Sequence, residues 1–395
     1  MRVRGLIAVL ALAGGLVLFG AEAPAFAYGD WNTNGVIDLD DYAQFSACLT
    51  GPGGGVGTGC DVFDFDADTD VDVFDFAAFQ RVFGTSTPLE MVFISAGEFE
   101  MGDSFGDGIW VELPVHTVYL SPYSINTHEV TNQQYADGLN WAYGQGGLIE
   151  VTGGVVYKYN SGTSYPYCDT DSYDSGSCIV WNGSTFAVES GRENQPMVKV
   201  SWYGSAAYAN WRSAMDGRTP CYDTTPWTCN FAANGYRLPT EAEWEKAARG
   251  GVPGHRFPWS DTDTIQHARA NYRSYWSGGA PYYPYDTSPT DGYHPDFDDE
   301  GYPYTSPVAY FAPNGYGLYD ATGNVREWCN DWYEMGYYGS SPYDNPQGPV
   351  SGTHRVARGG NWYDDAYSCR CAYRTGKTPD DRYYYLGFRL TLDSE

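Results

Sequence analysis

The sequence predicts an irregular α/β domain that follows a small acidic helical module. Two observations support this prediction. The 395 residues include 48 glycines, 23 prolines and 17% aromatic residues, a mixture typical of many turns and loops held by aromatic packing. Acidic residues recur at fixed spacing near the N-terminus, whereas the rest of the chain shows only short helix and strand patterns. We therefore expect a module at residues 28–84, a linker at 85–90 and a large domain at 91–392.

Residues 1–27 are predicted to be a secretory signal peptide. Arg2 and Arg4 precede an apolar run from Leu6 to Phe19, and the segment closes on small residues that end at Ala27. The apolar run is short for a membrane span and no second run of that kind follows, although a retained N-terminal anchor is the alternative. We expect a mature protein without a membrane span that is secreted or extracytoplasmic, in the periplasm or at the cell surface.

The net charge of −28 excludes one class of partner and favours one class of ion. Nucleic acid is excluded because its phosphates would be repelled. Residues 28–90 hold twelve Asp or Glu against a single Arg, so this segment supplies −11 of the total. A solvated acidic surface explains part of the charge, and calcium binding explains its concentration in one segment.

The acidic residues of this segment follow the spacing of a calcium loop, twice. A hard cation needs several oxygens from one tight loop. The two predicted ligand sets, 34 residues apart, are Asp30, Asn32, Asn34, Asp38 and Asp41, then Asp64, Asp66, Asp68, Asp72 and Asp75. A disordered acidic linker is the alternative, but it does not explain the apolar residues that repeat at the same offset. These are Tyr42, Phe45 and Leu49, then Phe76, Phe79 and Phe83, each trio on one helix face.

This duplicated pattern resembles the type I dockerin repeats, which are paired EF-hand-like units. The resemblance implies an α-helical, Ca²⁺-binding module that docks to a cohesin-like or cell-surface partner. Two features depart from the family pattern. Thr69 stands at the turn glycine of the second loop, and an insert runs from Cys48 to Cys60 between the repeats.

Nine cysteines in an exported chain predict disulfides. The local candidate pairs and one long-range guess are Cys48–Cys60, Cys168–Cys178, Cys221–Cys229 and Cys329–Cys369. One cysteine must remain, and we expect it to be Cys371. The sequence does not determine the connectivity.

Helices are few in residues 91–392, and their starts are marked by capping residues. Thr131 with Gln134 and Thr240 with Glu243 form capping boxes, and Ser201 opens a third helix. The predicted strands are short: Met91–Ile94, Thr117–Leu120, Val198–Val200, Arg355–Ala357 and Phe388–Leu392. Residues 142–195 look like a surface insertion, and residues 252–312 are mostly loop.

Ordered blocks along the large domain resemble the formylglycine-generating enzyme (sulfatase-modifying factor) family. Among them are Glu129-Val130-Thr131-Asn132, Arg237-Leu238-Pro239-Thr240-Glu241, Gly323-Asn324-Val325-Arg326-Glu327-Trp328 and Arg358-Gly359-Gly360-Asn361-Trp362. The resemblance covers about residues 91–392. It implies a C-type-lectin-like architecture with little regular secondary structure, which fits the loop-rich pattern.

The resemblance also implies two structural calcium sites. The first uses the side chains of Asp320 and Glu327 and the backbone of Gly323 and Val325. A polar turn before Trp328 is the alternative for this stretch. The second site uses Asn271, the backbone of Tyr272, Glu300 and the backbone of Tyr302.

Active members of the family resemble a pattern with two cysteines five apart, which bind Cu(I) because soft thiolates select that ion. Counting from Gly359-Gly360 places Asp364 at the first cysteine, Asp365 at the following histidine and Cys369 at the second cysteine. Cys369 and Cys371 are two apart, on opposite sides of an extended segment, and Asp neighbours disfavour a thiolate. We therefore expect the copper centre to be missing.

Three hypotheses follow. The first is an exported, calcium-stabilised domain of this family without the copper–cysteine centre, which binds a peptide or glycan and is tethered by the dockerin-like segment. The alternative is a formylglycine-generating oxidase that uses copper and O₂ to convert a sulfatase cysteine to Cα-formylglycine, with Cys369 and Cys371 as its catalytic residues. The third is a purely structural surface protein.

Overall fold

The computed structural model describes residues 39–50, 55–58, 60, 63, 71, 75, 89–170, 176–298 and 302–393. The predicted signal peptide lies outside these ranges, as does the side chain of Asp41. Further predicted site residues outside them are Asp30, Asn32, Asn34, Asp38, Asp64, Asp66, Asp68, Asp72 and Glu300. None of the helices in the described ranges has the length and apolarity that a bilayer crossing requires.

The described part of the N-terminal module contains one helix, α1 (Leu39–Cys48), closed by a disulfide. The Cys48–Cys60 bond, with an S–S distance of 2.07 Å, confirms that predicted pair. Phe45 is fully buried and packs edge-on against Phe63 with a centroid distance of 5.3 Å. Tyr42 is 42% and Leu49 is 47% exposed, and the second predicted trio, Phe76, Phe79 and Phe83, lies outside the described residues. The small core consists of Phe45, Cys48, Cys60, Phe63 and Val71, with Val56 packed against it.

The large domain is closed by a sheet that joins its two ends. The strand order is β1-β4-β19-β12, all antiparallel. The strands are β1 (Met91–Ile94), β4 (Tyr123–Asn126), β12 (Tyr236–Arg237) and β19 (Thr391–Asp393). Because β1 and β19 both pair with β4, the first and last strands of the domain stabilise each other's position.

The second sheet holds the late segment of the chain, which carries the candidate site. Its order is β17-β16-β15-β18, with β15 and β18 parallel and the other pairs antiparallel. The strands are β15 (Arg326–Trp332), β16 (Arg355–Arg358), β17 (Arg374–Lys377) and β18 (Leu386–Gly387). All residues of β15 except the last are buried, so this strand is the centre of the site region.

Two helices form the main apolar core with an inserted β-layer. Helix α3 (Asn132–Gln145) begins at the predicted Thr131 capping box, and α4 (Trp202–Met215) begins at Ser201, whose hydroxyl accepts from the Gly204 amide. Tyr135 of α3 stacks on Tyr208 of α4 at 5.3 Å. The predicted insertion is ordered into β5 (Ile149–Thr152), β6 (Val155–Lys158) and β7 (Pro166–Asp169), with the hairpin β8 (Ile179–Trp181) and β9 (Phe186–Val188).

Helix α5 (Glu241–Ala248) is buried along its whole length, although half of its residues are charged. The predicted capping box of Thr240 and Glu243 opens it. Each of its three glutamates pairs with buried arginines: Glu241 with Arg374, Glu243 with Arg237, and Glu245 with Arg249 and Arg358. Arg358 and Arg374 attach α5 to the second sheet, and Arg237 attaches it to β12 of the first sheet.

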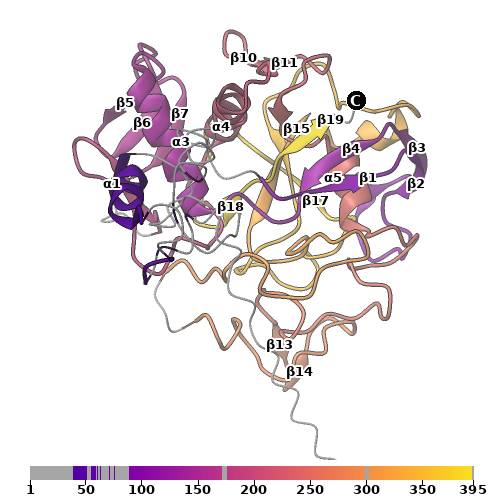
Figure 1. Cartoon of the computed structure of the whole chain (residues 1–395). Helices are drawn as coiled ribbons and strands as arrows, with labels where there is room; N and C mark the ends of the chain where they lie inside the picture. The colour runs from indigo at the N-terminus through magenta and orange to yellow at the C-terminus, as the bar shows by residue number, and fades with distance from the viewer. Residues whose placement is uncertain are drawn as a thin grey trace, which may run out of the picture.

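The remaining elements are hairpins and single turns. They are β2 (Gly97–Met101) with β3 (His116–Leu120), β10 (Tyr222–Asp223) with β11 (Thr228–Cys229), β13 (Trp276–Ser277) with β14 (Ala280–Pro281), and the 3₁₀ turns η2 (Trp110–Glu112) and η3 (Tyr337–Gly339). Hairpin β13–β14 lies apart from both four-stranded sheets, at the lower end of the view in Figure 1. Residues 252–312 are otherwise loop, as predicted.

Two predicted strands are wrong. Val198–Val200 is not a strand because Lys199 adopts a left-handed φ of 57°, although Val200 makes one isolated bridge with Cys168. Phe388–Leu392 is split, because the chain leaves the second sheet after β18 and joins the first at β19. Between them, the backbone of Phe388 and Leu390 bonds to Val130 and Asn126.

Candidate functional site

The loop before β15 is the point where four distant segments meet. The Asn324 amide donates to the carbonyl of Asn271 at 2.7 Å, and the Asn324 carbonyl accepts from Trp362 at 2.9 Å. The Asn324 side chain accepts from the Ser306 amide at 3.0 Å. Gly323 is required beside it, since a Cβ there would lie 2.3 Å from the Asn271 oxygen, and its φ is +79°. This loop therefore positions the 271, 306 and 359–362 segments together.

Asp364, which stands where the sequence comparison places the first copper cysteine, is held by an arginine. Its Oδ2 accepts from Nε of Arg326 at 2.8 Å and from the Asn361 amide nitrogen at 2.5 Å. Burial raises the pKa of the Asp364 carboxyl, and the charge of Arg326 opposes that rise. Asp365, at the histidine position, accepts from the Tyr283 hydroxyl at 2.9 Å. The position thus contains a charged hydrogen-bond network.

The two candidate catalytic cysteines lie in different clusters. Cys369 is fully buried with Phe257, Tyr272 and Ala366, while Cys371 packs with other residues that include Trp244 and Cys329. Burial, then Asp364 and Asp365, raise the pKa of the Cys369 thiol well above its usual value. Burial raises the pKa of Cys371 to about 12. Cys369 and Cys371 are thus buried thiols with raised pKa values in separate clusters, and such a pair does not fit Cu(I), which binds thiolates.

The other predicted disulfides are not formed in this structure. Seven cysteines are free thiols: Cys168, Cys178, Cys221, Cys229, Cys329, Cys369 and Cys371. Cys329 and Cys369 belong to separate clusters, which explains why the long-range guess is wrong. Cys221 and Cys229 lie at the ends of hairpin β10–β11, where Cys229 pairs in register with Tyr222 rather than with Cys221. We expected Cys371 to be the single unpaired cysteine, and it is instead one of seven free thiols.

The first predicted calcium loop contains a buried carboxylate oxygen that lacks a partner. Asp320 has a left-handed φ of 53°, and its Oδ2 accepts from the Ala309 amide at 2.7 Å. Its Oδ1 has no hydrogen-bond partner, and neither has Oε2 of the fully buried Glu129. Burial raises the pKa of Asp320 to about 7, and burial and then Asp320 raise the pKa of Glu129. Unpaired oxygens at this depth fit the donor set of a hard cation.

Glu327, the other predicted carboxylate of this loop, forms an ion pair with Arg389. Its oxygens accept from Nε and Nη2 of Arg389 at 2.6 and 2.7 Å, and Trp244 donates to it at 2.8 Å. In the described ranges, no three His, Cys, Asp or Glu side chains converge on one metal position. The predicted set needs only two carboxylates, because the backbone of Gly323 and Val325 completes it.

The second predicted calcium loop lies directly beside the first. Asn271 is almost fully buried, and its side-chain amide donates to the Tyr304 carbonyl at 2.8 Å. The Tyr272 carbonyl contacts the ring of His267 at 3.1 Å, and Tyr302 is 39% exposed. The Asn324–Asn271 backbone bond joins the two loops, so an ion in either would order both.

Aromatic rings gather at Trp362, two residues before Asp364. Trp362 is buried and contacts a set of tyrosine rings at centroid distances of 5.1 to 5.7 Å: Tyr293, Tyr302, Tyr304, Tyr363 and Tyr384. We call this set the Trp362 cluster. Tyr363 is 44% exposed, so the cluster reaches the surface. Rings of this kind provide large contact areas with a polar tip.

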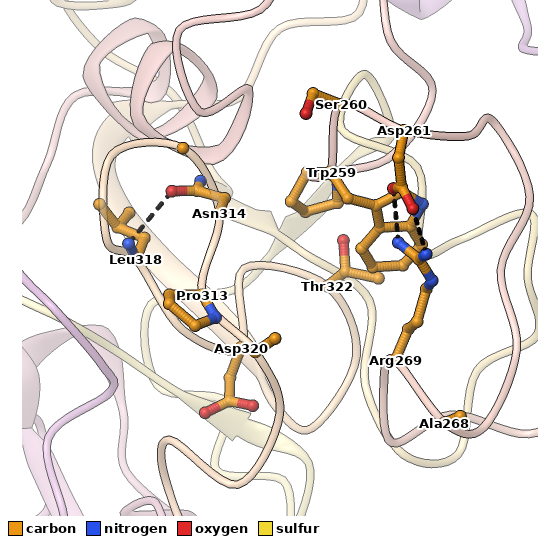
Figure 2. Close-up of a pocket in the computed structure, with 13 residues that line it drawn as sticks. Trp259, Ser260, Asp261, Ala268, Arg269, Pro313, Asn314, Leu318, Asp320 and Thr322 are labelled. Carbon is orange, nitrogen blue, oxygen red and sulfur yellow. Dashed lines mark hydrogen bonds and ion pairs between the residues drawn. The ribbon is translucent and has the colours of Figure 1, made fainter.

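A separate hollow of about 530 Å³ lies between the 258–269 and 312–322 segments. Figure 2 shows the Arg269–Asp261 ion pair beside Trp259 on one wall and Pro313 with Asn314 on the other. The carboxylate of Asp320 points away from Trp259 in this view. Asp320 is one of the residues that line the hollow, whereas Asp364 is not.

Sequence reasoning missed three residues that organise the site: Arg326, Asn324 and Glu129. Their side-chain hydrogen-bond partners lie 18 to 195 residues away along the chain, which no local spacing reveals. The signal that could have found Arg326 was the pair of adjacent aspartates, which need a cation when buried.

A family model matches residues 78–394, described as "Sulfatase-modifying factor enzyme 1-like domain". A curated relative from Streptomyces coelicolor, named "Formylglycine-generating enzyme", is 34% identical over 326 residues, covering 76% of this chain and 88% of that protein. A Bos taurus relative named "Inactive C-alpha-formylglycine-generating enzyme 2" is 29% identical and covers 78% of this chain and 89% of that protein.

Solved structures agree with this fold. "Treponema denticola variable protein 1" superimposes with a TM-score of 0.51 at 27% identity, covering 77% of this chain and 95% of that one. "Crystal Structure of CarF" gives a TM-score of 0.51 at 26% identity, covering 78% of this chain and 99% of that one. The mixed sheets and the loop-rich 252–312 segment fit this C-type-lectin-like fold.

Proposed function

Because the chain belongs to the sulfatase-modifying factor family, we propose that its large domain is a ligand-binding member of that family without copper oxidase chemistry. The observation that carries this proposal is the Arg326–Asp364 ion pair, with Arg326 Nη2 2.7 Å from Oδ2. A carboxylate and a guanidinium occupy the position where a thiolate would have to bind the ion. Arg326 is 6% exposed, so the pair is part of the interior.

The ligand of this domain is a peptide or a glycan bound over the rings that gather at Trp362. The Trp362 cluster supports this assignment, since clustered aromatic residues with exposed edges are enriched in binding sites. Tyr363 and Tyr302 are the exposed members of the cluster, at 44% and 39%.

Calcium holds the loops of this site in the proposed protein. The free Asp320 Oδ1 supports a calcium ion bound with Glu327 and the backbone of Gly323 and Val325. The second loop, with Asn271 and Tyr272, binds another. The ions act as structural cross-links between loops that have few strand-to-strand hydrogen bonds.

The N-terminal module tethers the exported protein. Its repeated Asp and Asn spacing supports calcium loops of the dockerin kind, and the Cys48–Cys60 bond supports an oxidising, extracytoplasmic location. Its partner is a cohesin-like or cell-surface protein.

The second candidate function is a formylglycine-generating oxidase. It is favoured by relatives of that name from Streptomyces coelicolor and Thermomonospora curvata, each 34% identical to this chain. This function requires Cys369 to act with a second thiol, which would have to be Cys371.

One assay separates the two functions. The reduced full-length protein, supplied with Cu(I) and air, is incubated with a cysteine-containing sulfatase peptide, and aldehyde is measured by mass spectrometry. We expect no aldehyde above the protein-free control, and binding on glycan or peptide arrays. Aldehyde formation that is lost in Cys369→Ser would establish the oxidase instead.

A further inference from the structure

A row of tyrosine rings extends from hairpin β13–β14 to Asp365. Tyr275 contacts Tyr282 at 5.5 Å, Tyr282 contacts Tyr283 at 5.0 Å, and Tyr283 stacks on Tyr285 and Tyr367 at 5.6 and 6.0 Å. We call these five residues the tyrosine shelf. Its inner end is fixed, because the Tyr283 hydroxyl donates to Asp365 at 2.9 Å.

The outer part of the shelf is open to solvent. Tyr282 is 59% and Tyr275 is 42% exposed, large values for aromatic side chains in direct contact. A hollow of about 380 Å³ lies along the row and is lined by Asp107, Tyr282, Tyr283, Pro284, Tyr285 and Tyr367. Asp107 is the only charged side chain in that lining.

The back of the shelf is held rigidly. The guanidinium of Arg256 lies between Phe105 and Tyr285, at 4.2 and 4.4 Å from the ring centroids. The same guanidinium donates to Asp107 at 2.6 Å. On the other side, Arg370 lies 4.3 Å from the Tyr367 ring and forms a buried pair with Glu112. The Tyr285 and Tyr367 rings are therefore held in place without a ligand, which lowers the entropy cost of binding at this end of the shelf.

We propose that the tyrosine shelf binds a neutral oligosaccharide, an inference that rests on the proposed binding function and names its ligand class. A pyranose has an apolar face of C–H groups and a rim of hydroxyls. Tyrosine rings offer negative faces to C–H groups and hydroxyls to the rim. Asp107 at the edge of the hollow accepts from sugar hydroxyls, and its orientation is set by Arg256.

Charge and backbone geometry favour a neutral sugar over two other ligand classes. The chain carries a net charge of −28, and the hollow contains no lysine or arginine side chain, so sulfated or uronic sugars are repelled. A peptide that binds by strand addition needs a free sheet edge, and the strands of β13–β14 are two residues long. Ring faces and hydroxyls are what the shelf presents.

Titration calorimetry of the full-length protein tests the shelf. The titrated probes are cellohexaose, xylohexaose, mannohexaose and maltohexaose, with a heparin hexasaccharide as the anionic probe. Peptide binding is measured separately on an immobilised random-peptide library. We expect at least one neutral hexasaccharide to bind. Tyr282→Ala should weaken that binding about tenfold, whereas Tyr282→Phe, which keeps the ring, should stay within about threefold.

The matched control is Tyr310→Ala, since Tyr310 is 53% exposed but belongs to another ring group, with Phe297 and Phe311. It should bind like the wild type. The shelf is refuted if no neutral hexasaccharide binds, if only heparin or only peptides bind, or if Tyr282→Ala and Tyr310→Ala behave alike. Circular dichroism confirms that each variant is folded.

The shelf and the proposed function fail in different ways. Peptide binding without glycan binding overturns the shelf and leaves a binding domain. Conversion of the cysteine peptide to an aldehyde overturns the binding-domain proposal, whatever the sugar titrations show.

Discussion

At the scale of single residues, Arg326 decides what the site can do. Its guanidinium is buried, donates to Asp364 through Nε and lies over the Tyr373 ring at 5.0 Å. A buried guanidinium needs a counter-charge, so Asp364 has a structural task that a thiol could not perform. Burial, and then the carboxylates of Asp364 and Asp365, raise the pKa of the Cys369 thiol and so favour its neutral form.

Replacing Asp364 by Asn should leave Arg326 buried without its partner. We expect the variant to lose about 3 kcal/mol of unfolding free energy, measured by denaturant titration. Asp261→Asn is the matched control, because Asp261 also pairs with an arginine but its side chain is 62% exposed. It should lose clearly less, because solvent screens an exposed pair. Equal losses in both variants would mean that the buried Arg326–Asp364 pair contributes no more to the unfolding free energy than an exposed pair.

Cys369 should be chemically inert in the folded protein. Its thiol is fully buried and its pKa is raised, so the reactive thiolate is scarce at neutral pH. Iodoacetamide at pH 7.5 should label Cys369 and Cys371 only after denaturation, as read by peptide mass spectrometry. Rapid labelling of both in the native protein would show an open dithiol site.

At the scale of elements, helix α5 is the part of the chain that the arginines organise. Glu245 accepts from the Gly102 amide at 2.9 Å and pairs with Arg249 and Arg358. Burial opposes the charge of Glu245, but the two arginines hold the pKa of its carboxyl below the usual 4.5. Arg358 lies in β16, so this pair connects the helix to the sheet of the candidate site.

Glu245→Gln should destabilise the protein in a pH-dependent way. At pH 7 the loss should be about 3–5 kcal/mol, because two buried guanidinium groups lose their charge partner. The folded-state pKa is lowered, so the stabilisation is complete above pH 4.5 and disappears as the pH falls through the lowered pKa. The difference in unfolding free energy between wild type and variant should therefore be full at pH 7 and smaller at pH 3.

The control for this comparison is Glu100→Gln, at an exposed position of β2. It should change the unfolding free energy by less than about 0.5 kcal/mol at either pH. A loss from Glu245→Gln that is the same at pH 7 and pH 3 would contradict the ion-pair explanation.

Elements with local signals could be predicted from the sequence, and elements with distant partners could not. The capping boxes at Thr131 and Thr240 and strand β1 need only neighbours within a few residues, and all three are confirmed. The break between β18 and β19 depends on Asn126 and Val130, far away in the chain. Within the site, the absence of a cysteine at position 364 was readable, but its arginine partner was not.

At the scale of the whole molecule, the fold joins its ends through β4 and its loops through the 320–327 and 271–272 segments. Much of the surface between these fixed points is loop without ladder hydrogen bonds. Loops of this length need other cross-links, and calcium ions at the two adjacent predicted sites would supply them. The unpaired Asp320 and Glu129 oxygens are the local reason to expect an ion there.

Calcium should stabilise the protein, and Asp320 should be needed for part of the effect. At free calcium about 100 times the dissociation constant of a site, we expect a gain of about 2.7 kcal/mol, seen as a rise in Tm by calorimetry. Asp320→Ala should lose the part of the Tm rise that comes from calcium bound to the large domain. In EDTA, the Tm values of wild type and variant should lie close together. An identical calcium response in wild type and variant would exclude Asp320 as a ligand.

We propose that the buried Arg326–Asp364 ion pair occupies the position where the family resemblance implies a copper-binding cysteine. Competitive titration of the reduced protein with Cu(I) and a coloured chelator measures this most directly. We predict that the protein takes no stoichiometric copper from the chelator and that Cys369→Ser does not alter the curve. Tight binding of one Cu(I) per chain that is lost in Cys369→Ser would contradict the account.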